Sequence, residues 1–223
     1  MIRLIGLLGA KGSGKDTLAK FLIARFGIVR LSFAAALYKE VSEAYGVTVA
    51  FLENRKTKEK RLWKLRLANC KDPNFVEVAL QQLDAARRER GGLGRALSHR
   101  LGPIMRFIDM HLPRSPRWTM QLWGTEYRRK SRFGYGAYWV DKVRAVLEAN
   151  PHVQYVITDV RFLNEAKMVR EFNGVLVRVR RPQLEKREAE ARQAGTDTAL
   201  HPSETELAQY PVDLETFNRE GEP

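Results

Sequence analysis

Apolar residues occur in short runs that are separated by longer amphipathic stretches. The first run, Leu4 to Leu8, predicts a buried strand, and apolar residues at 18, 19, 22 and 23 share one face of a predicted helix that ends at Gly27. Residues 28–33 then predict a second strand, and residues 34–44 predict a second helix. This strand–helix–strand–helix opening predicts an α/β fold, in which a parallel sheet has helices on both faces.

The pattern changes between residues 47 and 118, where strand-like alternation is absent and Leu, Ala, Arg, Lys and Glu are abundant. We expect helices over roughly 57–69, 74–90 and 103–111, separated by segments that contain glycine or proline. Inserted into a parallel-sheet fold, such a block predicts a helical subdomain over the active site.

Three more strands are predicted in the last third of the chain, at 152–159, 175–181 and 212–217. Residues 183–194 are highly charged and have no clear apolar face. A polar helix that buries little surface is a poor core element, so we expect this segment to act as a mobile lid. Three arginines precede it and could close onto phosphates or simply form a solvated edge: Arg178, Arg180 and Arg181.

A glycine-rich turn joins the first predicted strand to the first predicted helix, with the sequence Gly9-Ala10-Lys11-Gly12-Ser13-Gly14-Lys15-Asp16-Thr17. Glycines allow the backbone to curl until successive N–H groups point at phosphate oxygens, and the helix N-terminus adds partial positive charge. Lys15 would reach the β- and γ-phosphates of a nucleoside triphosphate. The alternative is a turn without a ligand, but the strand–turn–helix context favours a phosphate-binding loop.

Two acidic residues are candidate metal ligands. Asp16 follows Lys15, at a position where a magnesium-binding Ser or Thr is usual, and a carboxylate beside a triphosphate is repelled unless a divalent cation lies between them. We therefore expect Asp16 to bind Mg²⁺, directly or through water, and Thr17 to reach a phosphate. Asp159 ends a predicted strand and either holds the same ion or caps the next helix. Arg161 should lie near the transferred phosphate.

Polar and aromatic residues are concentrated between residues 121 and 140. Arginines suit phosphate, aromatic rings suit stacking, and amide and hydroxyl groups suit the edges of a base, so the combination favours an anionic ligand with a flat ring. The alternative is that Trp123, Tyr138 and Trp139 belong to the core and that the arginines are surface residues. The candidate groups are Gln121, Thr125, Arg128 and Arg129, together with the aromatic residues of this stretch.

Composition limits the classes of protein that fit. The 223 residues suit one domain, and the single cysteine excludes an internal disulfide framework and suits a reducing, cytoplasmic location. Apolar runs are too short for a signal peptide or a membrane span, so no membrane partner is expected. The formal net charge of +13 favours anionic partners, which include both nucleotides and nucleic acids.

Six separate stretches together resemble the deoxynucleoside monophosphate kinases of tailed bacteriophages and their bacterial homologues. They occur in the order found in that family and extend over most of the chain: 12–17, 32–34, 122–128, 138–140, 158–166 and 201–204. The resemblance implies a three-layer α/β/α P-loop kinase fold in a single domain, with a helical monophosphate-binding insertion at about 47–130 and a lid at about 181–203. It also implies Mg²⁺-dependent phosphoryl transfer from ATP to a deoxynucleoside monophosphate (dNMP).

The resemblance also implies roles for individual residues. Lys15, Asp159 and Arg161 would be catalytic, and Asp16 and Asp159 would bind the metal. The acceptor would contact Gln121, Thr125, Arg128, Arg129 and Trp139. ATP would contact Gly12, Ser13, Gly14, Lys15, Asp16 and Thr17, together with Arg180 and Arg181 of the lid.

Two other functions stay open at this point. One is a kinase of another small phosphorylated metabolite on the same fold, and the other is an ATP-dependent nucleic-acid-binding protein. Because the chain has no recognition-helix motif, zinc ligands or aromatic RNA-binding signature, we expect nucleotides rather than nucleic acids as partners. A homodimer is an open alternative.

Overall fold

The computed structural model describes residues 3–10, 12–89, 101–186 and 206–219. The chain divides into two compact units. Unit 1 combines Met1–Ala34 with Val140–Pro223, and unit 2 is Ala35–Trp139. The boundaries fall inside helices α2 (Phe33–Tyr45) and α8 (Tyr138–Ala149).

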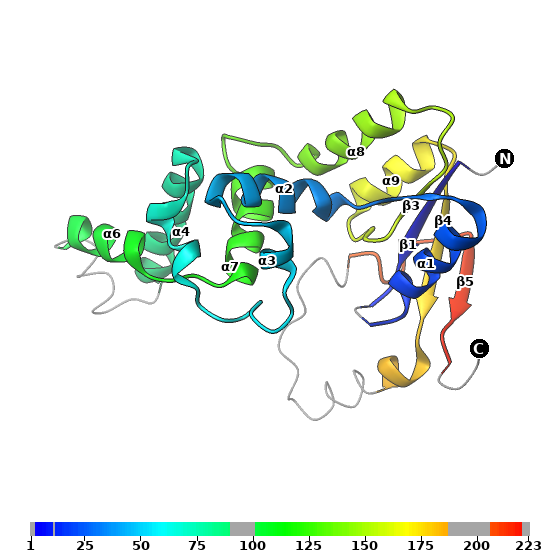
Figure 1. The fold of residues 1–223 in the computed structure, drawn as a ribbon, viewed down its shortest axis with the longest axis horizontal. Coiled ribbons are helices and arrows are strands. Elements are labelled where there is room, and N and C mark those ends of the chain that lie inside the picture. The colour runs from blue at the N-terminus through cyan, green and yellow to red at the C-terminus, as the bar shows by residue number, and fades with distance from the viewer. Residues whose placement is uncertain (1–2, 11, 90–100, 187–205, 220–223) are drawn as a thin grey trace. The chain divides into compact units, whose positions relative to one another are not determined.

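Unit 1 contains a five-stranded sheet in the order β2-β3-β1-β4-β5, in which every neighbouring pair is parallel (Figure 1). The central strand β1 pairs with β3 through Ile5 and Val156, and with β4 through Ile5 and Val175. This arrangement confirms the predicted α/β class and the parallel sheet. The strands are β1 (Leu4–Leu8), β2 (Val29–Leu31), β3 (Tyr155–Ile157), β4 (Val175–Arg180) and β5 (Leu214–Phe217).

Helices α1 (Lys15–Phe26) and α9 (Leu163–Glu171) cover opposite faces of this sheet. Alternate residues of a strand point to opposite faces. On one face Leu7 packs with Ala19 of α1, and on the other a side chain at Gly6 would lie 3.1 Å from a methyl group of Val169 in α9. The predicted covering of both faces is therefore confirmed.

Local signals explain where α1 ends and why β2 is short. Gly27 has a φ of 66°, and its N–H donates to the carbonyl of Ile23, which is the usual glycine ending of a helix. The second predicted strand, 28–33, is formed only at Val29–Leu31, because Phe33 already begins α2.

Unit 2 is helical, apart from a single antiparallel bridge between Leu62 and Arg114 among its described residues. The predicted helices over 74–90 and 103–111 are confirmed as α4 and α6. Buried Phe75, Trp123 and Tyr127 form the aromatic part of its core, with ring centroids 4.4–5.7 Å apart. Besides most of α2 and two short 3₁₀ helices, its described elements include α3 (Val49–Glu53), α4 (Pro73–Glu89), α6 (Gly102–His111), α7 (Pro116–Gln121) and the π-helix η3 (Leu122–Lys130).

The predicted helix over 57–69 is wrong. The segment consists of turns and two short 3₁₀ helices, η1 (Trp63–Leu65) and η2 (Leu67–Asn69). Leu65 and Leu67 are both fully buried, and two residues at this spacing point to opposite sides of an α-helix. The Asn69 amide also donates to the carbonyls of Trp63 and Lys64, which competes with helical pairing.

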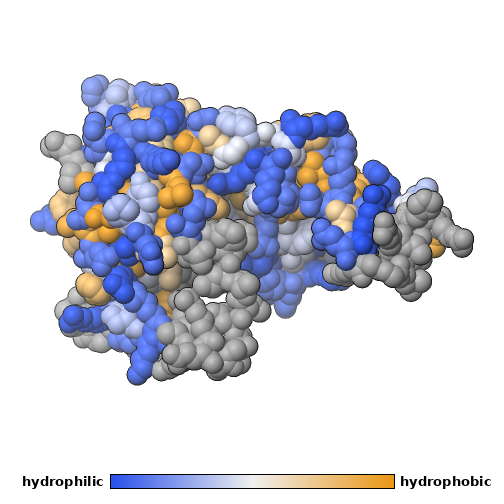
Figure 2. Space-filling model, turned by 180° about the vertical axis from the view of Figure 1, so that it is seen from behind, coloured by the Kyte–Doolittle hydropathy of each residue, from blue (hydrophilic) through white to orange (hydrophobic). Residues whose placement is uncertain are grey.

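Hydrophilic residues dominate the face shown in Figure 2, where hydrophobic residues lie in patches between them. Among the described residues, none of the helices combines the length and the hydropathy that a membrane-crossing helix needs.

Candidate active site

The glycine-rich loop connects β1 to α1, as predicted, and its backbone conformation requires glycine. Gly9, Gly12 and Gly14 have φ values of 135°, 85° and 107°. A side chain at Gly9 would place its Cβ 2.2 Å from the carbonyl oxygen of Val179, so no larger residue fits there. Ser13 is buried, and its N–H donates to the carbonyl of Ala10 at 3.2 Å, which closes the turn. The described residues of the loop therefore form a tight turn at the N-terminus of a helix.

Lys15 is folded over this loop. Its ammonium group donates to the carbonyl oxygens of Gly9 and Ala10, each at 2.6 Å, and lies 3.5 Å from the Ser13 hydroxyl. Burial, followed by the positive charge of Arg161, lowers the pKa of Lys15 to about 8. Because two positive groups interact across this region, an anion placed between them would be stabilised by both.

Asp16 and Thr17 occupy the exposed start of α1. The Asp16 side chain is 63% exposed and forms an ion pair with Arg30 at 3.0 Å. Asp16 and Asp159 both act electrostatically on Lys15, so both carboxylates lie in its neighbourhood. No group of three or more His, Cys, Asp or Glu residues suited to a metal ion occurs in the described part of the chain. These two carboxylates nevertheless fit Mg²⁺, which takes most of its ligands from water and substrate phosphates.

Asp159, which follows β3, caps α2 rather than the helix that follows it in sequence. Its carboxylate accepts hydrogen bonds from the Ser32 hydroxyl at 2.8 Å and from the N–H groups of Phe33 and Ala34 at 3.0 and 2.9 Å. A carboxylate offers about four acceptor positions, so one remains for a water molecule or an ion. The capping contacts therefore leave the predicted metal role open.

Arg161 is placed by a residue that the sequence analysis missed. The buried carboxylate of Glu165 accepts the N–H of Arg161 at 2.8 Å and the N–H of Phe162 at 3.1 Å, which fixes the backbone at the start of α9. The sequence carried only half of the usual signal, because Glu165 is at the third position of the helix but the N-cap, Phe162, has no side-chain oxygen to complete a capping box.

Arg180 ends β4 and Arg181 follows it, and the two differ in their surroundings. Arg180 makes a two-pronged ion pair with Glu185 at 2.9 and 2.8 Å, and this hydrogen bonding raises the pKa of Arg180. Arg181 instead donates to the carbonyl of Gly12 in the glycine-rich loop at 3.3 Å. Of the two, Arg181 is thus the one in contact with the loop. The predicted lid at about 181–203 lies mostly outside the described residues, which end at 186 before resuming at 206.

A second missed contact involves Asn218, just after β5. Its amide donates to the carbonyl of Ser13 at 3.1 Å, and a side chain at Gly14 would lie 2.6 Å from that amide nitrogen. Asn218 therefore supports the glycine-rich loop from the end of the sheet. No local sequence pattern could have predicted this contact, because Asn218 and Ser13 are 205 residues apart in the chain.

The predicted acceptor-binding residues all belong to unit 2. Thr125, Arg128 and Arg129 lie on η3 and are partly buried, whereas Gln121 is exposed at the end of α7. Trp139 is buried, and its indole N–H donates to the carbonyl of Gly124 at 3.0 Å. In the described conformation Trp139 thus packs inside unit 2, as does Trp123, and its ring supports η3 from within.

Replacing Trp139 with phenylalanine is expected to lower the free energy of unfolding by about 2–3 kcal/mol. The substitution removes a buried hydrogen bond, leaves the Gly124 carbonyl without its donor and opens a small cavity. Urea denaturation measures the change. Trp63→Phe is the matched control, because Trp63 is 66% exposed and its replacement should change stability by less than about 0.5 kcal/mol. Equal effects of the two substitutions would contradict the structural role of Trp139.

Glu40 on α2 connects the residues of this cluster. Its carboxylate accepts hydrogen bonds from Trp123 Nε1 at 2.9 Å, from Arg128 Nε at 2.8 Å and from the Tyr138 hydroxyl. The sequence analysis did not identify Glu40, because its partners are more than 80 residues away in the chain.

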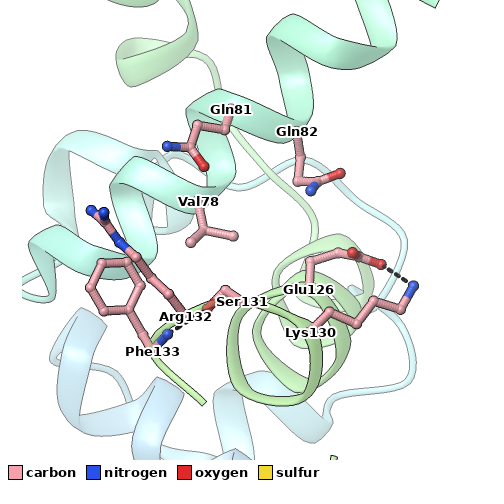
Figure 3. Close-up of a pocket in the computed structure, with 8 residues that line it drawn as sticks. All are labelled: Val78, Gln81, Gln82, Glu126, Lys130, Ser131, Arg132 and Phe133. Atoms are coloured by element: carbon pink, nitrogen blue, oxygen red, sulfur yellow. Dashed lines mark hydrogen bonds and ion pairs between the residues drawn. The ribbon is translucent and has the colours of Figure 1, made fainter. Parts of the chain in front are cut away.

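A pocket of about 340 Å³ lies between α4 and η3 in unit 2 (Figure 3). The charged groups along it are paired: Lys130 with Glu126 at 3.1 Å, and Arg132 with Glu77 at 3.1 Å. The pocket contains none of the predicted acceptor-binding residues. It is lined by Val78, Gln81, Gln82, Glu126, Lys130, Ser131, Arg132 and Phe133.

Comparison with known proteins gives two similar proteins, although no family model matches the chain. The chain is 30% identical, over an alignment of 252 positions, to the deoxynucleoside-5'-monophosphate kinase of Escherichia phage T5, covering 97% of this chain and 89% of the relative. It is 28% identical over 208 residues to a putative deoxynucleotide monophosphate kinase of Acanthamoeba polyphaga mimivirus, covering 92% of this chain and 81% of the relative.

Proposed function

The chain belongs to the deoxynucleoside monophosphate kinases, and on this basis we propose that it transfers the γ-phosphoryl group of ATP, in line, to the phosphate of a dNMP. The products are ADP and a deoxynucleoside diphosphate. The observation that carries this proposal is the phosphate loop itself, with Lys15 folded over its carbonyls and electrostatically coupled to Arg161.

On the donor side, the phosphates of ATP replace the loop carbonyls as partners of Lys15. The N–H groups of the loop, including those of Gly12, Ser13 and Gly14, and the Thr17 hydroxyl complete the binding of the phosphates. Asp16 and Asp159 would hold Mg²⁺, which supplies positive charge against the β- and γ-phosphates when bound. The remaining ATP contacts come from Arg180 and Arg181.

Catalysis then rests on position and charge. A phosphate oxygen of the acceptor attacks the γ-phosphorus, so the reaction needs no strong general base. Arg161 and Lys15 stabilise the negative charge that develops on the transferred group. Closure of the proposed lid at about 181–203 would exclude water and so suppress hydrolysis of ATP.

The acceptor is proposed to bind in the helical insertion of about 47–130 and the residues that follow. Arg128 and Arg129 contribute charge for its phosphate, and Gln121 and Thr125 contribute hydrogen bonds. Trp139 takes part by supporting η3, since its ring is buried there. The expectations of a cytoplasmic location and of no nucleic-acid or membrane partner stay predictions.

The test is ADP release from Mg²⁺ and ATP, coupled to NADH oxidation, with each common dNMP and NMP as acceptor. We expect ADP and a deoxynucleoside diphosphate in equal amounts with at least one dNMP, and loss of turnover when EDTA removes the metal. Absence of turnover with every monophosphate, together with ATP hydrolysis stimulated by DNA or RNA, would contradict the proposal.

A further inference from the structure

Glu40 is a partly buried carboxylate that accepts hydrogen bonds from three donors. The Oε2 atom accepts from Arg128 Nε at 2.8 Å and from Trp123 Nε1 at 2.9 Å, and Oε1 accepts from the Tyr138 hydroxyl. The side chains of Glu40 and Arg128 are only 17% and 18% exposed. An ion pair in such surroundings is strongly oriented, because each partner would be left as an unpaired, largely desolvated charge if it turned away.

The planar group of Arg128 is also held by aromatic rings. Its Cζ atom lies 4.4 Å from the ring centroid of Tyr127 and 4.9 Å from that of Tyr138. The rings are fixed in turn at their hydroxyl groups, because Tyr127 donates to Asp72 at 2.7 Å and Tyr138 donates to Glu40. The two rings therefore fix the plane of the guanidinium, and the hydrogen bond to Glu40 fixes its direction.

The terminal nitrogens of Arg128 remain largely available. Its Nε is taken by Glu40, and Nη1 donates to the carbonyl of Phe133 at 3.4 Å. Among the residues that the structure describes, the other three of its five N–H groups have no hydrogen-bond acceptor. Two parallel N–H groups on the edge of a fixed guanidinium match two oxygens of a phosphate.

We propose that Glu40 is a positioning residue for the acceptor: it orients Arg128 so that the terminal nitrogens bind the phosphate of the dNMP. This inference rests on the proposed function. A guanidinium that is already oriented loses little conformational entropy when the phosphate binds, so removing its anchor weakens binding of the acceptor and not of ATP. Glu40 itself does not touch the substrate.

The first measurement compares the wild-type chain with Glu40→Gln, which keeps the shape of the side chain and one acceptor oxygen but removes the charge. We expect the KM for the dNMP to rise about tenfold, in line with the weakening of charge-assisted hydrogen bonds, while the KM for ATP changes less than about twofold. Glu43→Gln is the matched control on the same helix, because Glu43 is 66% exposed and pairs only loosely with Lys39. It should leave both KM values unchanged.

A double-mutant cycle separates positioning from a general structural role. If Glu40 acts through Arg128, Glu40→Gln should raise the dNMP KM less than about twofold when it is introduced into Arg128→Gln. Equal effects of Glu40→Gln in the two backgrounds would overturn the inference. An unchanged dNMP KM in Glu40→Gln would do so too, provided that circular dichroism shows a folded chain.

Two further measurements keep the test decisive. Should Glu40→Gln fail to fold, Tyr138→Phe removes one of the three donors while keeping the ring over Arg128, and we expect a smaller rise in the dNMP KM, of about two- to fivefold. No rise in this variant would overturn the inference. Inactivity of the wild-type chain with every dNMP would instead reject the proposed function, and the inference with it.

Discussion

Replacing Lys15 with alanine is expected to lower kcat at least about 100-fold, the scale on which removal of one preorganised charge-stabilising group acts. Its ammonium donates to the carbonyl oxygens of Gly9 and Ala10 in the glycine-rich loop, and an alanine side chain supplies no charge in its place. The coupled ADP-release assay measures the loss. Single-turnover measurements by rapid quench would show whether the phosphoryl-transfer step itself is slowed.

The same substitution should leave the fold intact, and this separates a catalytic effect from misfolding. Burial and the neighbouring Arg161 lower the pKa of Lys15 to about 8, so the folded state disfavours the charged form at neutral pH. Removing that charge should therefore keep or slightly raise the thermal unfolding midpoint. Lys20→Ala, at an exposed position of the same helix, is the control and should change kcat less than about twofold. A Lys15→Ala variant that keeps a tenth or more of the wild-type kcat would contradict the proposed role.

The features that could be predicted from the sequence are those specified by neighbouring residues. The strand, the loop with Gly9, Gly12 and Gly14, and the helix that begins at Lys15 lie within about twenty residues, and each has its own local signal. The parallel sheet followed from the order of strands and helices. Local patterns therefore predicted the strand, glycine-rich turn and helix that the structure shows.

Local patterns failed where contacts over long sequence separations decide the structure. The segment 57–69 has the composition of a helix, but the burial of both Leu65 and Leu67 and the bridge from Leu62 prevent one. Glu40 and Arg128 are 88 residues apart, so no local pattern could connect them. The predicted cluster at 121–140 was thus located by its composition, whereas the carboxylate that organises it was not.

The π-helix η3 is a further feature that no periodicity indicated. Its nine residues, Leu122–Lys130, have a wider turn than an α-helix, and such turns persist where other contacts stabilise them. Here the Trp139 indole donates a hydrogen bond to the Gly124 carbonyl, and the Glu40 carboxylate accepts hydrogen bonds from Trp123 and Arg128. The unusual backbone and the proposed acceptor-binding residues therefore coincide, which supports a functional reason for the wide turn.

Replacing Asp159 with asparagine is expected to reduce activity and stability together, because the carboxylate has two proposed roles. As a cap it accepts three hydrogen bonds at the start of α2, and an amide has only one oxygen with which to accept them. We expect the free energy of unfolding to fall by about 1–2 kcal/mol. As a metal-binding group its loss should lower kcat at saturating ATP about 100-fold or more and raise the Mg²⁺ concentration that is needed for half-maximal activity.

Ser32→Ala distinguishes the two roles of Asp159. It removes one donor to the carboxylate and leaves both oxygens and the charge, so stability should fall by about 1 kcal/mol while the Mg²⁺ dependence stays that of the wild type. Urea denaturation and a magnesium titration of ADP release, carried out on both variants, give the comparison. If Asp159→Asn lost stability but kept the wild-type kcat and Mg²⁺ dependence, Asp159 would be a helix cap alone. The charge at the metal would then have to come from Asp16, whose exposed carboxylate pairs with Arg30 in the described structure.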